Sequence, residues 1–171
     1  QWSDNNLYIN NQESGNIQFY TGGASRARLD SDGLKFGSDS AAANALSDYE
    51  EGTWTPTITQ GSVNTHTANY TKIGRVVHVT ARLEGFSNNS SGASLEIGGL
   101  PFTPSVTGIA QGTIMYSYIA DAHRTVLYLH SNDKLLIYGG HGGAYDNIKH
   151  SDLSVSGGST DIYFYVTYHA S

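Results

Sequence analysis

The chain has 171 residues and a formal net charge of −6, with Gly (20) and Tyr (12) abundant and no Cys. The absence of Cys excludes disulfides and thiolate metal sites, and the absence of a basic patch argues against nucleic acid as a partner. No apolar run is long enough to span a bilayer, so membrane insertion is not expected. Thr, Val, Ile and Tyr recur in short runs between Gly, Asn and Ser clusters, which predicts an almost wholly β protein.

A ten-residue repeat occupies the start of the chain. The segments 6–15, 16–25 and 26–35 align so that two apolar residues, two positions apart, precede a group of Gly, Asn, Asp and other turn residues. Apolar residues two apart mark one face of a β-strand, so each repeat is predicted to be a short strand and a turn. Such units gain stability by stacking on neighbours or on identical chains. The residues expected to contact other copies are Leu7, Ile9, Ile17, Phe19, Ala27, Leu29, Leu34 and Phe36.

The composition changes abruptly after the repeats. Residues 1–37 are interpreted as a repeat arm, residues 38–52 as a connector with one helical turn or two, and residues 53–171 as a β domain. Eight strands at the observed spacing suggest an antiparallel sandwich in this domain, with a jelly roll as the natural candidate. The strands are predicted at 53–60, 67–73, 75–85, 93–97, 108–119, 124–130, 134–138 and 160–169.

Alternation gives each predicted strand a core face and an outer face. Tyr163 and Tyr165 lie on the outer face of the last strand, and Tyr116 and Tyr118 are predicted to extend this row from another strand. Tyr is large and rigid yet carries a polar tip, so the row is interpreted as a subunit interface, with a ligand platform as the alternative. Trp54, at the start of the first strand, is predicted to be a core anchor rather than a sugar platform.

Three motifs resemble those of a known module. YEEGTWTPTI (49–58), NYTKIGRVVHVTARL (69–83) and LEIGGLPFTP (95–104) stand in the order found in C-terminal head modules of bacteriophage tail fibres and tailspikes. SRARLDSDGLKFG (25–37) also resembles the repeats that often precede such heads. The resemblance implies a homotrimer with a three-chain β-structured arm and a β-sandwich head, joined to an upstream fibre shaft and placed at the distal end of the virion's fibre or spike. Because distal regions of the family vary with the host, no residue role in 105–171 is carried over.

The most site-like segment is 139–154, a Gly-rich stretch predicted to be a loop of about fifteen residues, which is long for a compact domain. Sugars are bound by aromatic faces that cover C–H patches and by planar polar side chains that pair with hydroxyls. Loops at 86–92 and 120–124 are further candidates, and a mobile tip loop or an inter-chain contact is the alternative interpretation. The predicted glycan-binding residues are Asp121, His123, His141, Tyr145, Asp146, Asn147 and His150.

Metal binding, cofactors and catalysis are not predicted. The seven His residues show no HExxH or comparable spacing. One His per chain on a three-fold axis would still supply three metal ligands, with His78 and His141 as nominees. A glycosidase needs two carboxylates about 5–9.5 Å apart, and the sequence nominates no such pair.

The preferred hypothesis is a non-enzymatic, homotrimeric fibre tip that attaches a virion to a host surface glycan, either capsule or lipopolysaccharide. Three copies per fibre would multiply a weak single contact. One alternative is a trimerisation or folding-clamp head that touches no receptor. Another is part of a polysaccharide-degrading tailspike, and a trimeric jelly-roll signalling domain of the animal type is disfavoured by the phage-like motifs.

Overall fold

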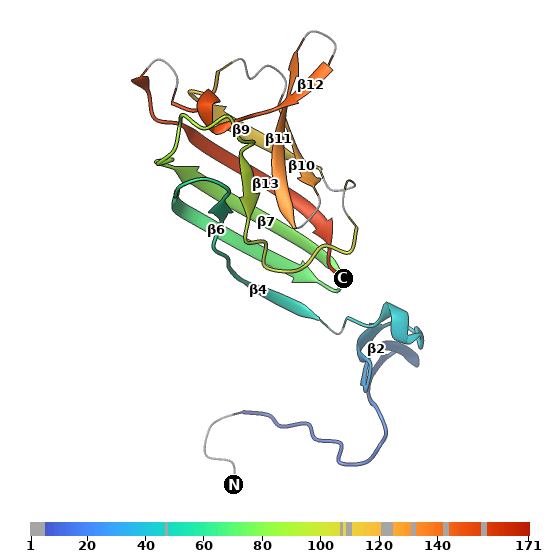
Figure 1. Ribbon diagram of the computed structural model, residues 1–171. Helices are drawn as coiled ribbons and strands as arrows, with labels where there is room; N and C mark the ends of the chain where they lie inside the picture. Colours follow the sequence, from blue (N-terminus) through green and yellow to red (C-terminus); the bar gives the residue numbers. More distant parts are fainter. Residues whose placement is uncertain are drawn as a thin grey trace. The chain divides into compact units, whose positions relative to one another are not determined.

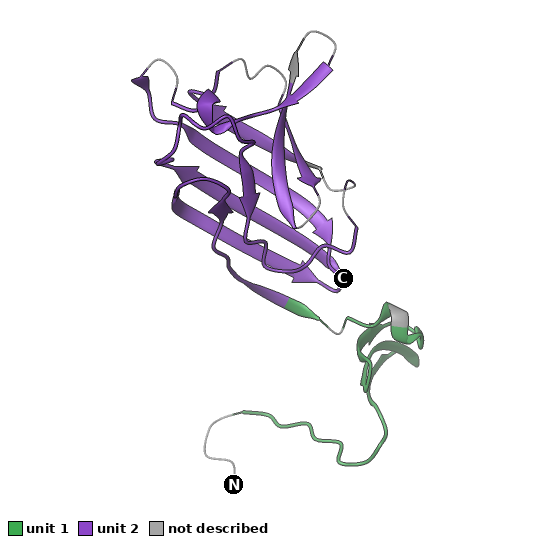
Figure 2. Ribbon diagram, viewed as in Figure 1, with its two compact units in different colours: residues 1–49 green, residues 50–171 purple. Residues whose placement is uncertain are grey.

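The computed structural model of this chain describes residues 6–46, 48–106, 108, 111–120, 125–130, 133–141, 144–154 and 157–171. Within these residues the chain is almost entirely β, which confirms the predicted class. The two helices described, η1 (Ala42–Asn44) and η2 (His150–Asp152), are 3₁₀ turns of three residues each, and neither could cross a membrane. The chain divides into unit 1 (residues 1–49) and unit 2 (residues 50–171), coloured separately in Figure 2.

Unit 1 contains a three-stranded antiparallel sheet built from the second and third repeats. Strands β1 (Ile17–Thr21), β2 (Ala24–Asp30) and β3 (Gly33–Phe36) follow one another in sequence order. The turn between β1 and β2 consists of Gly22 and Gly23, with φ angles of 59° and 75°. Two consecutive left-handed residues give the turn whose twist matches an antiparallel hairpin, and this requirement accounts for the paired glycines.

The register places the apolar residues of these repeats on one side of the sheet, which we call the apolar face of unit 1. Residues directly opposite one another in antiparallel strands share a face, as do residues two apart along one strand. Leu46 joins this face through a β-bridge to Leu34. Phe36 is 64% exposed, so the face is largely open in the single chain. Its two rows are Ile17–Leu29–Leu34–Leu46 and Phe19–Ala27–Phe36.

The first repeat does not form the predicted strand. Residues 6–16 contain no strand, and Leu7 and Ile9 are 86% and 58% exposed. A strand is stabilised by pairing its backbone groups with a neighbour, and no described strand of the same chain pairs with this segment. The prediction of a strand and a turn in every repeat is therefore confirmed for the second and third repeats and wrong for the first.

The opposite face of unit 1 is charged and centred on Lys35, whose side chain is almost fully buried. Its Nζ lies 3.0 Å from Asp30 Oδ2 and 2.5 Å from Asp32 Oδ2, and Arg28 Nε lies 2.8 Å from Asp30 Oδ2. The hydrogen bond from Lys35 lowers the pKa of Asp30, and the hydrogen bond to Asp32 raises the pKa of Lys35. Two carboxylates thus compensate the burial of one ammonium group.

Unit 2 is built on a curled ten-stranded sheet whose described pairings are antiparallel. Nine strands follow the order β4-β6-β7-β13-β9-β10-β11-β8-β5, and β12 pairs with β11 off this path (Figure 1). The strands are β4 (Tyr49–Thr53), β5 (Thr57–Ile58), β6 (Asn64–Ile73), β7 (Val76–Glu84), β8 (Glu96–Gly98), β9 (Gln111–Ser117), β10 (Val126–His130), β11 (Lys134–His141), β12 (Ala144–Asn147) and β13 (Asp161–His169).

The hydrophobic core of unit 2 joins side chains from both halves of the curled sheet. Val79 on β7 and Leu127 on β10, for example, are fully buried members of the same cluster. Trp54 belongs to this core: its Nε1 donates a hydrogen bond to Thr80 O at 3.1 Å, and its ring meets Phe164 edge-on at 6.3 Å. The prediction that Trp54 is a core anchor is confirmed.

Two of the sequence motifs form tight turns of unit 2. In the YTKIG motif the hairpin between β6 and β7 turns at Gly74, which has a φ of 57°. In the GLPF motif Gly99 has a φ of 80°, and a Cβ atom there would lie 2.2 Å from Thr55 O. Only glycine satisfies both the left-handed φ and that close approach, so this turn holds the segment before β5 against the end of β8.

The predicted strand at 53–60 is instead two shorter strands, because β4 ends at Thr53 and β5 covers only Thr57–Ile58. Pro56 lies between them, and proline has no N–H to donate to a strand ladder. The predicted helical turn of the connector is η1. The clearest strands, β7 and β13, agree closely with the predictions at 75–85 and 160–169.

Candidate functional site

The segment predicted to be a loop at 139–154 is mostly ordered structure. Gly139 pairs with Asp146 and Gly140 with Tyr145, so β11 and β12 form a hairpin, and η2 follows it. Gly139 and Gly140 thus lie within β11 and do not end it. In Figure 1 the hairpin projects from the end of unit 2 opposite to β4, where that unit begins.

Strand alternation separates the predicted sugar-binding residues that are adjacent in sequence. Tyr145 and Asn147, two positions apart on β12, share one face of the hairpin, and Asp146 points to the other. Asn147 Nδ2 donates a hydrogen bond to Ser94 Oγ at 3.1 Å, so its amide is held against the neighbouring loop. The aromatic and acidic groups therefore flank β12 from opposite sides.

Tyr145 is the exposed end of a row of three tyrosines, which we call the tyrosine ladder. Its ring meets Tyr138 edge-on at 5.2 Å, and Tyr138 meets Tyr128 edge-on at 5.5 Å. Tyr145 is 73% exposed, whereas the other two rings are half-buried. Burial of Tyr138, and to a smaller extent the neighbouring Tyr145 and Tyr128, raises the pKa of its phenol. The ladder holds a rigid aromatic surface at the hairpin.

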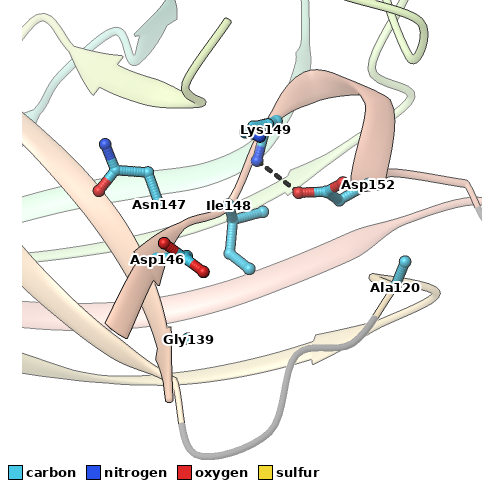
Figure 3. A pocket seen from close by; sticks show the side chains of 7 residues that line it. All are labelled: Ala120, Gly139, Asp146, Asn147, Ile148, Lys149 and Asp152. Carbon is cyan, nitrogen blue, oxygen red and sulfur yellow. Dashed lines mark hydrogen bonds between the residues drawn. The ribbon is translucent and has the colours of Figure 1, made fainter. Parts of the chain in front are cut away.

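A polar hollow of about 260 Å³ lies on the other side of β12 (Figure 3). Asp152 Oδ2 accepts a hydrogen bond from Lys149 N at 2.8 Å, and Asp152 O accepts one from Ala120 N at 2.8 Å, which fixes the wall formed by η2. The exposed Asp146 carboxylate makes no hydrogen bond or ion pair with any described residue. The lining residues are Ala120, Gly139, Asp146, Asn147, Ile148, Lys149 and Asp152.

His150 is placed differently from the other predicted site residues. Its side chain is fully buried, and its Nδ1 lies 3.2 Å from Asn88 O. Its backbone N donates to Ala93 O, and Ser151 N donates to Ser91 O, so η2 is anchored to the loop after β7. His150 supports the wall of the hollow from inside and has no surface to offer a ligand.

The remaining predicted glycan ligands are not positioned by the structure. Asp121 and His123 lie outside the described residues. His141 ends β11, but its side chain is outside the described part of the structure. Of the seven predicted residues, Tyr145, Asp146 and Asn147 thus lie on β12, with Asp146 on the face opposite to the other two.

A second surface, which we call the outer groove, lies on the outer side of β6, β7, β13 and β9. It has a volume of about 330 Å³. Met115 is 61% exposed and pairs with Tyr163, and Arg82 lies over the Tyr163 ring at 5.1 Å from its centre. The hydroxyl of Thr113 donates to that of Tyr165 at 3.1 Å. The lining residues are Thr67, Thr80, Ala81, Arg82, Thr113, Met115, Tyr163, Phe164 and Tyr165.

The outer tyrosine row has a different membership from the one predicted. Tyr116 pairs with Ile162 and packs against the core, and Tyr118 lies beyond the end of β9 with a φ of 52°. The prediction that Tyr116 lies on the outer face is wrong, because Tyr116 shares the core-facing side of β9 with Ile114. Met115 therefore joins Tyr163 and Tyr165, and only the pairing of β9 with β13 reveals this.

An ion-pair network borders the outer groove. Glu84 and Asp161 are directly opposite one another on β7 and β13, and Arg82 Nη2 lies 3.3 Å from Glu84 Oε2 and 3.4 Å from Asp161 Oδ2. His66 Nε2 contacts Glu84 Oε1. Sequence spacing gave no sign of this carboxylate pair, because the two residues are far apart along the chain.

Among the described residues no three His, Asp or Glu side chains are grouped so as to hold a metal ion. His78, nominated for a metal on a three-fold axis, lies with its Nδ1 2.9 Å from Thr167 Oγ1 and its ring beside Tyr165. No protein-family model, curated protein sequence or solved structure matches the chain. The resemblance to phage fibre heads thus rests on the sequence motifs alone.

Proposed function

We propose that this chain is a non-enzymatic, homotrimeric fibre tip that attaches a bacteriophage to a host surface glycan. The observation that carries the proposal is the combination, at one end of unit 2, of an exposed aromatic ladder with a polar hollow on the other side of the same strand. The Tyr145 ring offers a face for the C–H patch of a sugar, and the exposed Asp146 carboxylate, which has no partner among the described residues, would accept hydrogen bonds from hydroxyls. Both lie on β12, which is paired with β11.

Homotrimer formation is supported by the apolar face of unit 1. Burial of a large apolar side chain contributes roughly 1.5–3 kcal/mol, whereas ordering each backbone residue costs about 1–2 kcal/mol. A three-stranded sheet that leaves Phe19, Leu29 and Phe36 exposed gains little of this burial alone. Three copies that point this face at a common axis would bury it, and the arm would then be an intertwined trimeric shaft. We also propose that the curled sheet of unit 2 is a jelly-roll-like β-sandwich.

The placement of the motifs supports the resemblance on which the phage assignment depends. The EEGTWTP segment contains the core anchor Trp54, the YTKIG motif ends in the Gly74 hairpin, and the GLPF motif begins at the left-handed Gly99. Each motif thus has a structural role in one module. Within unit 2 the β11–β12 hairpin lies at the end opposite to β4 (Figure 1), which suits a contact with the host at that end.

A trimerisation clamp is the second candidate function. The apolar face of unit 1 and the outer groove both favour it, since Tyr, Met and Arg are enriched in protein–protein interfaces. A clamp requires no ligand, so it predicts that the trimer binds no host polysaccharide through the β11–β12 hairpin. The two candidate functions therefore differ in whether the purified chain binds a host polysaccharide.

The test is binding of the full chain to an array of bacterial surface polysaccharides. We expect at least one polysaccharide to bind, and we expect Tyr145→Ala to weaken that binding by about tenfold, since loss of an aromatic contact is worth about 0.5–1.5 kcal/mol beyond its buried area. Tyr20→Ala, which removes an exposed tyrosine from unit 1, is the matched control and should bind as the unaltered chain does. If Tyr145→Ala binds a polysaccharide as tightly as the unaltered chain does, Tyr145 is not part of the binding site. If the chain binds none of the polysaccharides on the array, the trimerisation clamp is favoured.

A further inference from the structure

We infer that Tyr118 is a second aromatic contact for the glycan, held in position by a strained backbone beside the polar hollow. This inference rests on the proposed glycan-binding function and adds a contact residue to that site. It follows from the backbone conformation of Tyr118, from the residues that fix this conformation and from the exposure of its side chain.

The backbone of Tyr118 adopts a conformation that tyrosine rarely takes. Its φ of 52° lies in the left-handed region, which favours glycine and which a residue with a Cβ atom occupies at a cost. The side chain is 50% exposed, so full burial in the core does not offset this cost. Strained residues of this kind persist where the surrounding structure fixes them, and they cluster at ligand-binding and active sites.

The buried side chain of Thr160 fixes the conformation of Tyr118. Thr160 is 1% exposed, and its Oγ1 donates a hydrogen bond to Tyr118 O at 2.9 Å and accepts one from Ser154 N at 2.7 Å. Ser154 is itself left-handed, with a φ of 56°. One buried hydroxyl group thus joins two of the three non-glycine residues with positive φ in the described part of the chain.

A glycine lies directly against the Tyr118 ring. A Cβ atom on Gly158 would lie 2.1 Å from Tyr118 Cε1 and 2.4 Å from Cζ, so only glycine lets the backbone pack this closely on the ring. The ring is therefore supported by the backbone of Gly158, while half of the side chain remains exposed. An aromatic ring held in this way can cover the C–H patch of a sugar without first being ordered by the ligand.

The segment after Tyr118 is tied to the wall of the hollow. Ile119 forms a β-bridge with Leu153, which follows η2. Ala120 N donates a hydrogen bond to Asp152 O at 2.8 Å, and both residues line the hollow (Figure 3). Tyr118 precedes Ala120 by two residues, so their Cα atoms are at most about 7.6 Å apart. A ligand of several sugar units in the hollow could therefore also contact the Tyr118 ring.

The variant Tyr118→Gly distinguishes a ligand contact from a structural role. Glycine removes the ring and relieves the left-handed strain, so the midpoint of urea unfolding should stay unchanged or rise. Binding should nevertheless weaken by about tenfold, because an aromatic contact is lost. The 171-residue chain is titrated with a panel of purified capsular polysaccharides and lipopolysaccharide O-chains.

Asp133→Gly is the matched control. Asp133 is also left-handed, with a φ of 60°, and it lies in the turn between β10 and β11, at the opposite end of β11 from the β11–β12 hairpin. Its replacement relieves the same kind of strain without removing a ring. Asp133→Gly should therefore bind every polysaccharide as the unaltered chain does.

Gly158→Ala tests the position of the ring without removing it. The φ of Gly158 lies outside the left-handed region, so alanine suits the backbone, but its Cβ atom would displace the Tyr118 ring. We expect weaker binding than for the unaltered chain, with a smaller loss than in Tyr118→Gly. Unchanged binding by Gly158→Ala would contradict a contact that depends on this ring position.

The outcomes separate this inference from the proposed function. If Tyr118→Gly bound as tightly as the unaltered chain while Tyr145→Ala bound less tightly, the inference would be overturned and the glycan site would stand. An unfolding midpoint of Tyr118→Gly well below that of Asp133→Gly would also overturn it, because the ring would then be a packing residue. If the unaltered chain bound no member of the panel, both the proposed function and the inference would be wrong.

Discussion

At the scale of single residues, Trp54 shows how one side chain links the entry segment to the core. Its ring packs on Phe164, and its indole N–H satisfies the Thr80 carbonyl at 3.1 Å. These are two separable contributions, one from apolar burial and one from a hydrogen bond. Substitutions that remove one or both should therefore give a graded series.

We expect Trp54→Ala to lower the free energy of unfolding by about 3–5 kcal/mol, as for other large aromatic residues removed from a core. Trp54→Phe retains most of the ring and loses the hydrogen bond, so its cost should be smaller, about 1–3 kcal/mol. Urea unfolding followed by circular dichroism measures both. If both variants lowered the free energy of unfolding equally, the stabilisation by Trp54 would come from its hydrogen bond and not from its packing.

At the scale of elements, the charged face of unit 1 should make β2 and β3 sensitive to pH. The folded chain holds the pKa of Asp30 below its ordinary value of about 3.9, so this stabilisation is present above that pH and is lost as the pH falls further. The pKa of Lys35 is raised above about 10.4, so its contribution is present below that pH and is lost as the pH rises.

Hydrogen exchange of the peptides that cover β2 and β3, corrected for intrinsic rates, checks this expectation. Protection should be greatest between about pH 4 and 10 and should fall on both sides of that range. Asp30→Asn should lower protection at neutral pH and flatten the acid side. If the unaltered chain and Asp30→Asn lost protection in parallel on acidification, the Asp30–Lys35 pair would not be the cause.

The outer groove yields a second element-scale prediction. If the groove is a contact between heads, a nitroxide attached at Met115→Cys should be immobilised in the assembled protein, since the chain has no other Cys. Gln60→Cys, at an exposed position beside β5, is the control and should give a mobile spectrum. A mobile label at both positions would show that the outer groove is exposed in the assembled protein and is not part of the interface.

Sequence periodicity located the elements whose faces differ most in polarity. The alternation of Val77, Val79 and Ala81 with polar residues placed β7 correctly, because one side of that strand is buried. The β11–β12 hairpin was not predicted, since Gly139 and Gly140, in the second half of β11, have no side chains to alternate and glycine is typical of turns. The contact between Met115 and the outer tyrosines depends on which strands are neighbours.

The candidate site was also predicted only in part, because residue type does not reveal how the strands pair. Residue type indicated Tyr145, Asp146 and Asn147, but not that strand pairing would place the ring and the carboxylate on opposite sides of β12. The support of Tyr145 by Tyr138 and Tyr128 also comes from strand pairing. His150 was indicated by its polarity, although a buried histidine bonded to a backbone carbonyl is a structural residue.

At the scale of the whole molecule, the proposed trimer accounts for the open apolar face of unit 1. Sedimentation equilibrium of the full chain should give three times the chain mass of 18.4 kDa. Phe19→Asp would place a charge in the Phe19–Ala27–Phe36 row, which the proposed trimer would bury, and should shift the equilibrium toward monomer. Gln18→Asp, on the opposite face of the same strand, should remain trimeric. A monomeric unaltered chain at micromolar concentration would contradict the trimer.

The central claim is that the chain is the part of the fibre that contacts the host. It is tested most directly by competition, in which the purified 171-residue chain is added to host cells before the phage proposed to carry it. We predict that the unaltered protein blocks adsorption and that Tyr145→Ala does so much less effectively, while Tyr20→Ala blocks as well as the unaltered protein. Undiminished adsorption in the presence of saturating, trimeric, unaltered protein would contradict the claim.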